Sequence, residues 1–224
     1  MSGIMLVDKP QGWTSHDVCQ YVKKNFRVQK VGHGGTLEPF ATGLLVLYID
    51  ESTKLAGQSL NHEKVYEGSL HLGVETSTGD PDGEIVSEGQ VDQNLTPEAI
   101  QKVFDEFLGK GFQIPPMTSA VKQKGVPLYK LARKGKVVAR ESRPVEIFEL
   151  KVLKFESPFV QFRTKVSKGT YIRVLAEQIG RRLGSGASLE SLRRISSGPY
   201  HIENAKPVTG LTINDERLNT IRSL

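Results

Sequence analysis

The most informative stretch of the chain is Lys30-Val-Gly-His-Gly-Gly-Thr-Leu-Glu-Pro-Phe-Ala-Thr-Gly43. Its four glycines allow positive φ angles and let a large ligand approach the backbone closely. It carries one carboxylate, Glu38, and Pro39 biases that residue away from helical dihedral angles. The segment lacks the Gly-Lys-Ser/Thr ending of a phosphate-binding loop. Two interpretations stay open: a functional loop that presents Glu38, since loops often carry function, or a solvated acid among turn glycines, which is the more common case.

His33 lies in the same loop, five residues before Glu38. A lone histidine is more often a hydrogen-bonded structural residue than a catalyst. No second His or Cys stands at metal-ligand spacing, and Cys19 is the only cysteine, so neither a metal site nor an internal disulfide is expected. The sequence does not indicate a Ser–His–Asp catalytic triad either.

On both sides of this loop, the hydrophobic pattern predicts a mixture of strands and helices. Expected strands cover residues 4–7, 44–49, 63–73, 84–87, 144–153 and 159–166. Helices are expected from Thr14 or Ser15 to Phe26, from Thr96, from Tyr171 to Leu183 with Thr170 as its cap, and around Ser188–Arg194. Hairpins without regular βαβ alternation indicate an α+β fold, and residues 1–224 are expected to form a single domain.

Charge is unevenly distributed along the chain, whose net charge is +5. Residues 63–108 hold two Lys and Arg against eleven Asp and Glu, whereas residues 109–200 hold 19 against six, a balance of +13. A basic region of this kind suits a polyanion, because each neutralised phosphate releases counterions. Folding could also mix both blocks over one surface, so charge alone favours a nucleic-acid ligand only slightly.

A second candidate site is Ser167-Lys-Gly-Thr-Tyr-Ile-Arg173, which joins a strand to a helix. The first amides of that helix and Lys168 would suit an anion, and Arg173 could pair with a buried carboxylate. The alternative is a basic surface turn. Four further arginines are expected on nearby helices, where they could form a face that contacts phosphates. The alternative is that they are ordinary solvent-exposed helix residues. They are Arg181, Arg182, Arg193 and Arg194.

Composition narrows the class of protein. The 224 residues are 38% hydrophobic and 25% charged, values of an ordinary globular protein. No apolar run approaches the roughly 18 residues of a membrane span, and the first eight residues lack the pattern of a signal peptide. The sequence predicts a soluble, cytoplasmic protein that does not bind membranes, and nothing in it indicates an oligomer, so a monomer is expected.

Taken together, the motifs resemble the bacterial tRNA pseudouridine synthase B family, in order and over nearly the whole chain. Any one of them is weak alone, but their common order is specific. The matching stretches are Leu6–Ser15, Lys30–Gly43, Lys64–Tyr66 with Leu72-Gly73 and Asp80–Gly83, Gln113–Lys122 with Leu128-Tyr129 and Ala132-Arg133, Ser167–Arg173 and Leu192–Arg194.

The resemblance implies the pseudouridine synthase fold, a mixed and mostly antiparallel sheet flanked by helices around an RNA-binding cleft. It also implies an isomerase that needs no cofactor or metal. The substrate would be a uridine in the tRNA T loop, position 55, which is flipped out of its stack and converted to pseudouridine.

By position in the family's motifs, Glu38 would be the catalytic carboxylate and Arg173 would pair with it. Tyr66 would stack on the target base near C5, and Tyr171 would help to wall the pocket with Leu192. His33 would occupy the space that the base vacates. The RNA backbone would be contacted by Lys168, Arg193 and Arg194.

Two departures from the family pattern accompany the resemblance. The family's loop carries Asp at the position of Glu38, and the family usually continues into a small C-terminal RNA-binding domain, whereas this chain ends at Leu224. A second functional class therefore stays open, an impaired or catalytically silent protein that binds or folds tRNA. Retention of Tyr66, Arg173 and His33 favours the enzyme.

Overall fold

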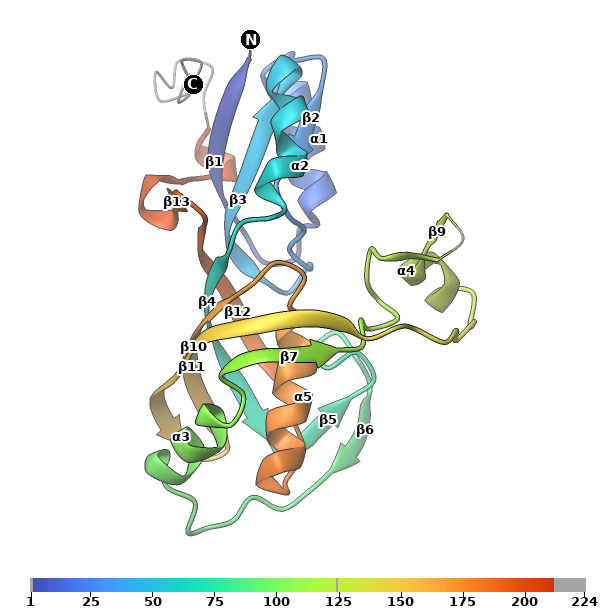
Figure 1. The fold of residues 1–224 in the computed structure, drawn as a ribbon. Helices are drawn as coiled ribbons and strands as arrows, with labels where there is room; N and C mark the ends of the chain where they lie inside the picture. The colour runs from blue at the N-terminus through green and yellow to red at the C-terminus, as the bar shows by residue number, and fades with distance from the viewer. Residues whose placement is uncertain (1, 124, 212–224) are drawn as a thin grey trace. The chain divides into compact units, whose positions relative to one another are not determined.

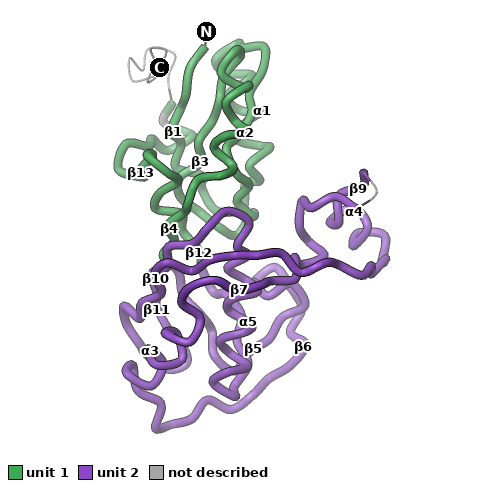
Figure 2. The backbone as a smooth tube through the Cα atoms, viewed as in Figure 1, with its two compact units in different colours: residues 1–67, 192–224 green, residues 68–191 purple. Residues whose placement is uncertain are grey.

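The computed structural model describes residues 2–123 and 125–211 (Figure 1). The chain divides into two compact units, Met1–Glu67 with Leu192–Leu224, and Gly68–Ser191 (Figure 2). Because the strands β4 (Lys64–Leu72) and β12 (Ala187–Ser197) cross the division, each contributes residues to both units. The units are described one at a time.

The first unit is built around strand β3 (Thr42–Ile49). It pairs antiparallel with β1 (Gly3–Lys9) and β2 (Val31–His33), and parallel with β12 through Arg193 and Arg194. Strand β14 (Lys206–Pro207) pairs with β1, and β13 (Tyr200–His201) pairs with β12. The remaining elements are α1 (Ser15–Asn25), α2 (Ala56–Ser59) and the 3-10 turns Asp50–Leu55, Ile202–Asn204 and Val208–Gly210.

The core of this unit forms on both faces of β1 and β3, which explains why these strands are almost continuously apolar. On one face, Val7, Leu45 and Leu47 pack with Val18 and Val22 of α1. On the other face lie Ile4, Leu6, Leu44, Val46 and Tyr48. Helix α1 begins as the sequence predicts, with Thr14 as N-cap in a reciprocal capping box with Asp17.

The second unit contains a meander in which β10 (Arg143–Glu156) pairs antiparallel with β7 (Gly109–Gln113) and β11 (Phe159–Val166). Two helices accompany it, α3 (Pro97–Asp105) and α5 (Ile172–Leu183). Buried Ile100, Phe104, Leu150, Phe162 and Ile179 are part of its core.

Two small hairpins complete the second unit. They are β5 (Val74–Thr76) with β6 (Ile85–Glu88), and β8 (Lys122–Gln123) with β9 (Val126–Pro127), which leads into α4 (Leu128–Ala132). In Figure 1, α4 and β9 lie on a long excursion between β7 and β10. This excursion coincides with the most basic part of the sequence.

The expected α+β class and mostly antiparallel sheet are confirmed. Two local expectations were wrong. Ser188–Arg194 is part of strand β12, not a helix, because its backbone pairs with β3. Thr170 does not cap α5: Tyr171 is the N-cap, and the Thr170 hydroxyl donates to the carbonyl of Ser167. Among the described residues, no helix has the length and apolar character needed to cross a bilayer.

Candidate active site

In the first unit, Glu38 lies on a loop whose backbone is held on both sides of it. The Leu37 amide donates to Ser15 Oγ at 2.8 Å, and that hydroxyl donates to the Leu37 carbonyl at 3.1 Å. The Pro39 carbonyl accepts from the Gly12 amide at 2.8 Å. The half-buried Glu38 side chain therefore projects from a backbone that is anchored to the turn before α1 and to the first residue of that helix.

Lys9 adds a buried charge to the same anchor. Its side chain is fully buried, and its ammonium donates to the carbonyls of Trp13 at 2.6 Å, Pro10 at 2.9 Å and Pro39 at 3.3 Å. Burial lowers the pKa of Lys9 to about 8, while the Glu38 carboxylate acts in the opposite direction. Lys9 therefore ties the turn at residues 10–13 to the residue that follows Glu38.

Arg194 holds the other part of the loop. It is only 1% exposed, and its guanidinium donates to the carbonyls of Leu44 at 2.7 Å, Gly35 at 3.1 Å and Thr36 at 3.4 Å. The expectation that Arg194 belongs to an exposed helical phosphate-contacting face was wrong, because it is buried in a strand. Its neighbour Arg193 is partly exposed and forms a bidentate ion pair with Asp8.

Glycine is required where the loop meets this arginine. Gly43 has φ +100, and a Cβ there would collide with the backbone of Arg194. A Cβ at Gly34 would overlap the side chain of Ser59. These two glycines of the motif therefore serve close packing of the loop.

Tyr66, from β4, shares the surroundings of Glu38 and Arg194. Tyr66 is 8% exposed, and the Arg194 guanidinium lies close enough to act on its phenol. Burial raises the pKa of Tyr66; Arg194 opposes the rise, and the Glu38 carboxylate adds to it. The phenol thus keeps its proton at neutral pH. Leu192, two residues before Arg194, is also buried in β12.

His33 is the last residue of β2 and precedes the loop glycines. Burial lowers its pKa, and the nearby Arg194 and His16 act in the same direction. Its Nδ1 atom is buried and has no hydrogen-bond partner among the described residues. A neutral imidazole is suited to stack on a nucleobase.

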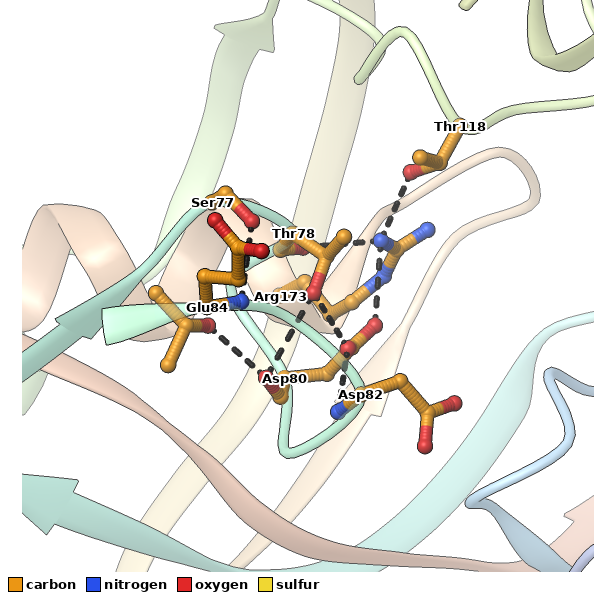
Figure 3. Close-up of polar contacts among 8 residues, drawn as sticks. Ser77, Thr78, Asp80, Asp82, Glu84, Thr118 and Arg173 are labelled. Atoms are coloured by element: carbon orange, nitrogen blue, oxygen red, sulfur yellow. Dashed lines mark hydrogen bonds and ion pairs between the residues drawn. The ribbon is translucent and has the colours of Figure 1, made fainter. Parts of the chain in front are cut away.

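In the second unit, Arg173 lies in the first turn of α5 and is almost completely buried (Figure 3). One of its terminal nitrogens contacts the Asp80 carboxylate at 3.1 Å, the Thr78 carbonyl at 2.8 Å and Thr118 Oγ1 at 2.8 Å. Asp80 is equally buried and also accepts from the Thr78 hydroxyl and the Asp82 amide. The turn between β5 and β6 thus fixes the guanidinium of Arg173.

Tyr171 and Lys168 precede Arg173 in the same turn. The buried side chain of Gln113 accepts from the Tyr171 amide at 2.9 Å and donates to its carbonyl at 3.4 Å, which fixes the start of α5. Tyr171 is half-buried, whereas Lys168 is exposed.

The candidate residues thus fall into two groups. Glu38, Tyr66, His33 and the Leu192–Arg194 stretch belong to the first unit, whereas Lys168, Tyr171 and Arg173 belong to the second. The ion pair between Glu38 and Arg173 stays a prediction. Sequence reasoning missed the positioning residues Lys9, Ser15, Asp80 and Gln113, although each lies in or beside a quoted motif.

Comparisons with known proteins agree on one family. A family model described as TruB family pseudouridylate synthase (N terminal domain) matches residues 23–172. The tRNA pseudouridine synthase B of Geobacter sulfurreducens is 47% identical over 205 residues, 92% of this chain and 67% of that protein. That of Francisella philomiragia is 44% identical over 211 residues, 94% of this chain and 70% of that protein.

A solved structure has the same fold. A chain in the crystal structure of a Cbf5-Nop10-Gar1 complex superposes with a TM-score of 0.71 at 33% identity, covering 91% of this chain. This chain spans 51% of the length of that solved chain. With the match of the family model and the identity to the two bacterial proteins, the conclusion is that the chain belongs to the TruB family of pseudouridylate synthases.

Proposed function

We propose that this protein isomerises a uridine of tRNA to pseudouridine, with Glu38 as the catalytic carboxylate. Family membership and the names of the bacterial relatives support the reaction. The observation that carries the assignment of Glu38 is the anchoring of the backbone at Leu37 and Pro39 on both sides of it. A catalytic group gains most from a fixed position, because a displacement of about 1 Å can cost on the order of a hundredfold in rate.

The reaction breaks the bond between ribose C1′ and uracil N1, turns the base and rejoins it to the ribose through C5. The C5 proton then leaves and N1 gains a proton, so the product is an isomer of uridine and no redox partner is needed. Glu38 acts at the ribose or base, Tyr66 stacks on the base near C5, and Arg173 orients the carboxylate and favours its ionised form. The nearby Arg194 guanidinium favours a fixed position of the phenol in this role.

We further propose that the target lies in the T loop, at position 55, and is swung out of its stack to reach the carboxylate. His33 then fills the vacated space, which its lowered pKa favours because a neutral ring stacks without the cost of desolvating a charge. Tyr171 and Leu192 line the uridine pocket. We also propose that the protein acts as a monomer in the cytoplasm.

The test is release of tritium from C5-labelled tRNA. We expect stoichiometric release by the wild-type chain under single-turnover conditions, together with a pseudouridine product at one position. The matched control is Glu38→Gln, which keeps the side chain's size but removes its charge. Binding of the labelled tRNA without release would contradict the enzymatic proposal and support a tRNA-binding or tRNA-folding protein.

The excursion between β7 and β10 is proposed to contact RNA phosphates. Its exposed cations include Lys130, Arg133, Lys134 and Lys136, within the +13 stretch. We expect a Lys134→Ala/Lys136→Ala variant to bind tRNA several-fold more weakly and to show a salt slope reduced by about two. The slope is the change of log Kd with log salt concentration, measured by filter binding.

The control for this variant is Lys102→Ala, which removes an exposed lysine from α3, outside the basic stretch. Its tRNA affinity and salt slope should match those of the wild type. Equal slopes for the double variant and the wild type would contradict the assignment of the excursion to phosphate binding.

A further inference from the structure

A basic groove of about 530 Å³ lies on the first unit, next to the Glu38 loop. One wall is the exposed side of α1, with His16, Gln20 and Lys23. The opposite wall is the segment that enters β2, with Gln29 and Lys30, and His33 lies at the end where the loop begins. The groove is thus adjacent in the chain to the proposed catalytic site without including Glu38.

No acidic side chain lines this groove among the described residues. The five acids of residues 1–62 explain why. Two are bound to basic side chains, Asp8 to Arg193 and Glu51 to Lys54, and Asp17 closes the capping box of α1. The fourth, Asp50, accepts from two backbone amides, and the fifth is Glu38 in the loop.

The Asp50 contacts also shape the groove. Asp50 Oδ1 accepts from the amides of Gln29 and Lys30, each at 2.9 Å. These bonds fix the backbone of both residues while their side chains remain in the lining. A stretch that is almost neutral by composition therefore presents a local surface with the cations of Lys23 and Lys30.

The polar groups of the groove suit a nucleotide better than a bare phosphate. The volume lies within the range of small-molecule sites and exceeds what a phosphate fills. Gln20 and Gln29 each offer amide donors and a carbonyl acceptor, which can read a base edge.

We propose that this groove binds a second nucleotide of the substrate RNA, close in sequence to the uridine that is isomerised. Lys23 and Lys30 contact its phosphates, and the two glutamines contact its base. The inference rests on the proposed function, since it concerns the same RNA. It adds a specificity subsite that is formed by residues preceding Glu38 in the sequence.

The first experiment compares binding of a tRNA transcript to Lys23→Ala/Lys30→Ala and to Lys24→Ala. Lys24 is the matched control, because it is also exposed in the last turn of α1 but does not line the groove. We expect the double variant to bind about tenfold more weakly, with a salt slope lower by about 1.5, and Lys24→Ala to bind within about twofold of wild type. Equal affinities for both variants would overturn the proposal.

The second experiment separates a nucleotide site from a general phosphate contact. T-arm hairpins carrying one abasic nucleotide each are titrated against wild type and Gln20→Ala/Gln29→Ala. We expect one abasic position, not the target uridine, to weaken wild-type binding about tenfold and to weaken the variant less than twofold. The absence of any such position would overturn the assignment of a base to the groove.

Pseudouridine formation is measured on the same samples, so that the two proposals fail in different ways. Lys24→Ala, which does not line the groove, should keep the wild-type single-turnover rate, and Lys23→Ala/Lys30→Ala is compared with it at saturating RNA. A wild-type chain that forms no product contradicts the proposed function, while the affinities above still decide the groove. A lowered rate at saturation with unchanged affinity overturns the groove as a binding subsite.

Discussion

Replacing Asp80 by Asn is expected to lower the single-turnover rate by about a hundredfold or more and the free energy of unfolding by about 3 kcal/mol. Asp80 and Arg173 are each 3% exposed and contact one another at 3.1 Å. Removing one partner of a buried pair leaves the other charge without compensation, which typically costs about 3–5 kcal/mol. The rate falls because Arg173 loses the contact that holds its guanidinium in place.

The matched control is Asp82→Asn, the same chemical change two residues further along the turn. The Asp82 carboxylate is exposed, so its loss should change the unfolding free energy by less than about 0.5 kcal/mol. Denaturant unfolding and tritium release measure the two quantities. An Asp80→Asn variant as stable and as fast as Asp82→Asn would show that the pair does not position Arg173.

A milder variant separates positioning from loss of the fold. Thr118→Val removes one acceptor of the Arg173 guanidinium but leaves the Asp80 ion pair intact. We expect a stability close to wild type with a rate lowered about tenfold, since the remaining contacts leave the side chain less constrained. A positioning role therefore predicts a rate loss in a folded protein, whereas a purely structural role does not.

Local signals in the sequence were sufficient for most of the elements. Thr14 with Asp17 marks the start of α1, and the apolar runs of β1 and β3 read correctly as buried strands. The prediction of a helix at Ser188–Arg194 was wrong because the leucines and arginines of this segment are also spaced as on a helix. What makes it a strand is pairing of Arg193 with Thr42, 151 residues away, which no local pattern contains.

The same reason accounts for the positioning residues that sequence reasoning missed. A lysine or arginine is expected at the surface, yet Lys9 and Arg194 are buried because backbone carbonyls of the Glu38 loop accept from them. The Asp80 partner of Arg173 lies 93 residues away in sequence. The motifs therefore locate candidate chemistry, whereas its supporting contacts come from tertiary structure.

The groove beside His33 shows that the charge of a sequence segment does not locate a basic surface in the fold. Residues 1–62 have a net charge of only +1, so the charge balance along the chain predicts polyanion binding by residues 109–200 instead. Lys23 and Lys30 line the groove together, and no acid among the described residues lines it, which the charge total does not reveal. Charge counts along a chain thus predict a polyanion ligand better than they predict its position.

The largest effect is expected at Glu38. Glu38→Gln should lower the single-turnover rate by about a thousandfold or more, because the amide carries no negative charge and cannot act as a base or nucleophile. Binding of tRNA should stay within about threefold, since the proposed phosphate contacts lie elsewhere. A Glu38→Gln variant that releases tritium at the wild-type rate would remove Glu38 from the mechanism.

Glu38→Asp tests placement instead of charge, and we expect this variant to be faster than the wild-type chain. Glu and Asp ionise similarly in water, so the difference is geometric: the extra methylene of Glu38 adds a bond of roughly 1.5 Å. The neighbouring backbone is tied to Ser15, Gly12 and Lys9, so the side chain itself must absorb that length. A Glu38 protein at least as fast as the Asp variant would refute this expectation and show that the anchored loop is fitted to glutamate. Product from the Asp variant alone would place the whole defect in one methylene.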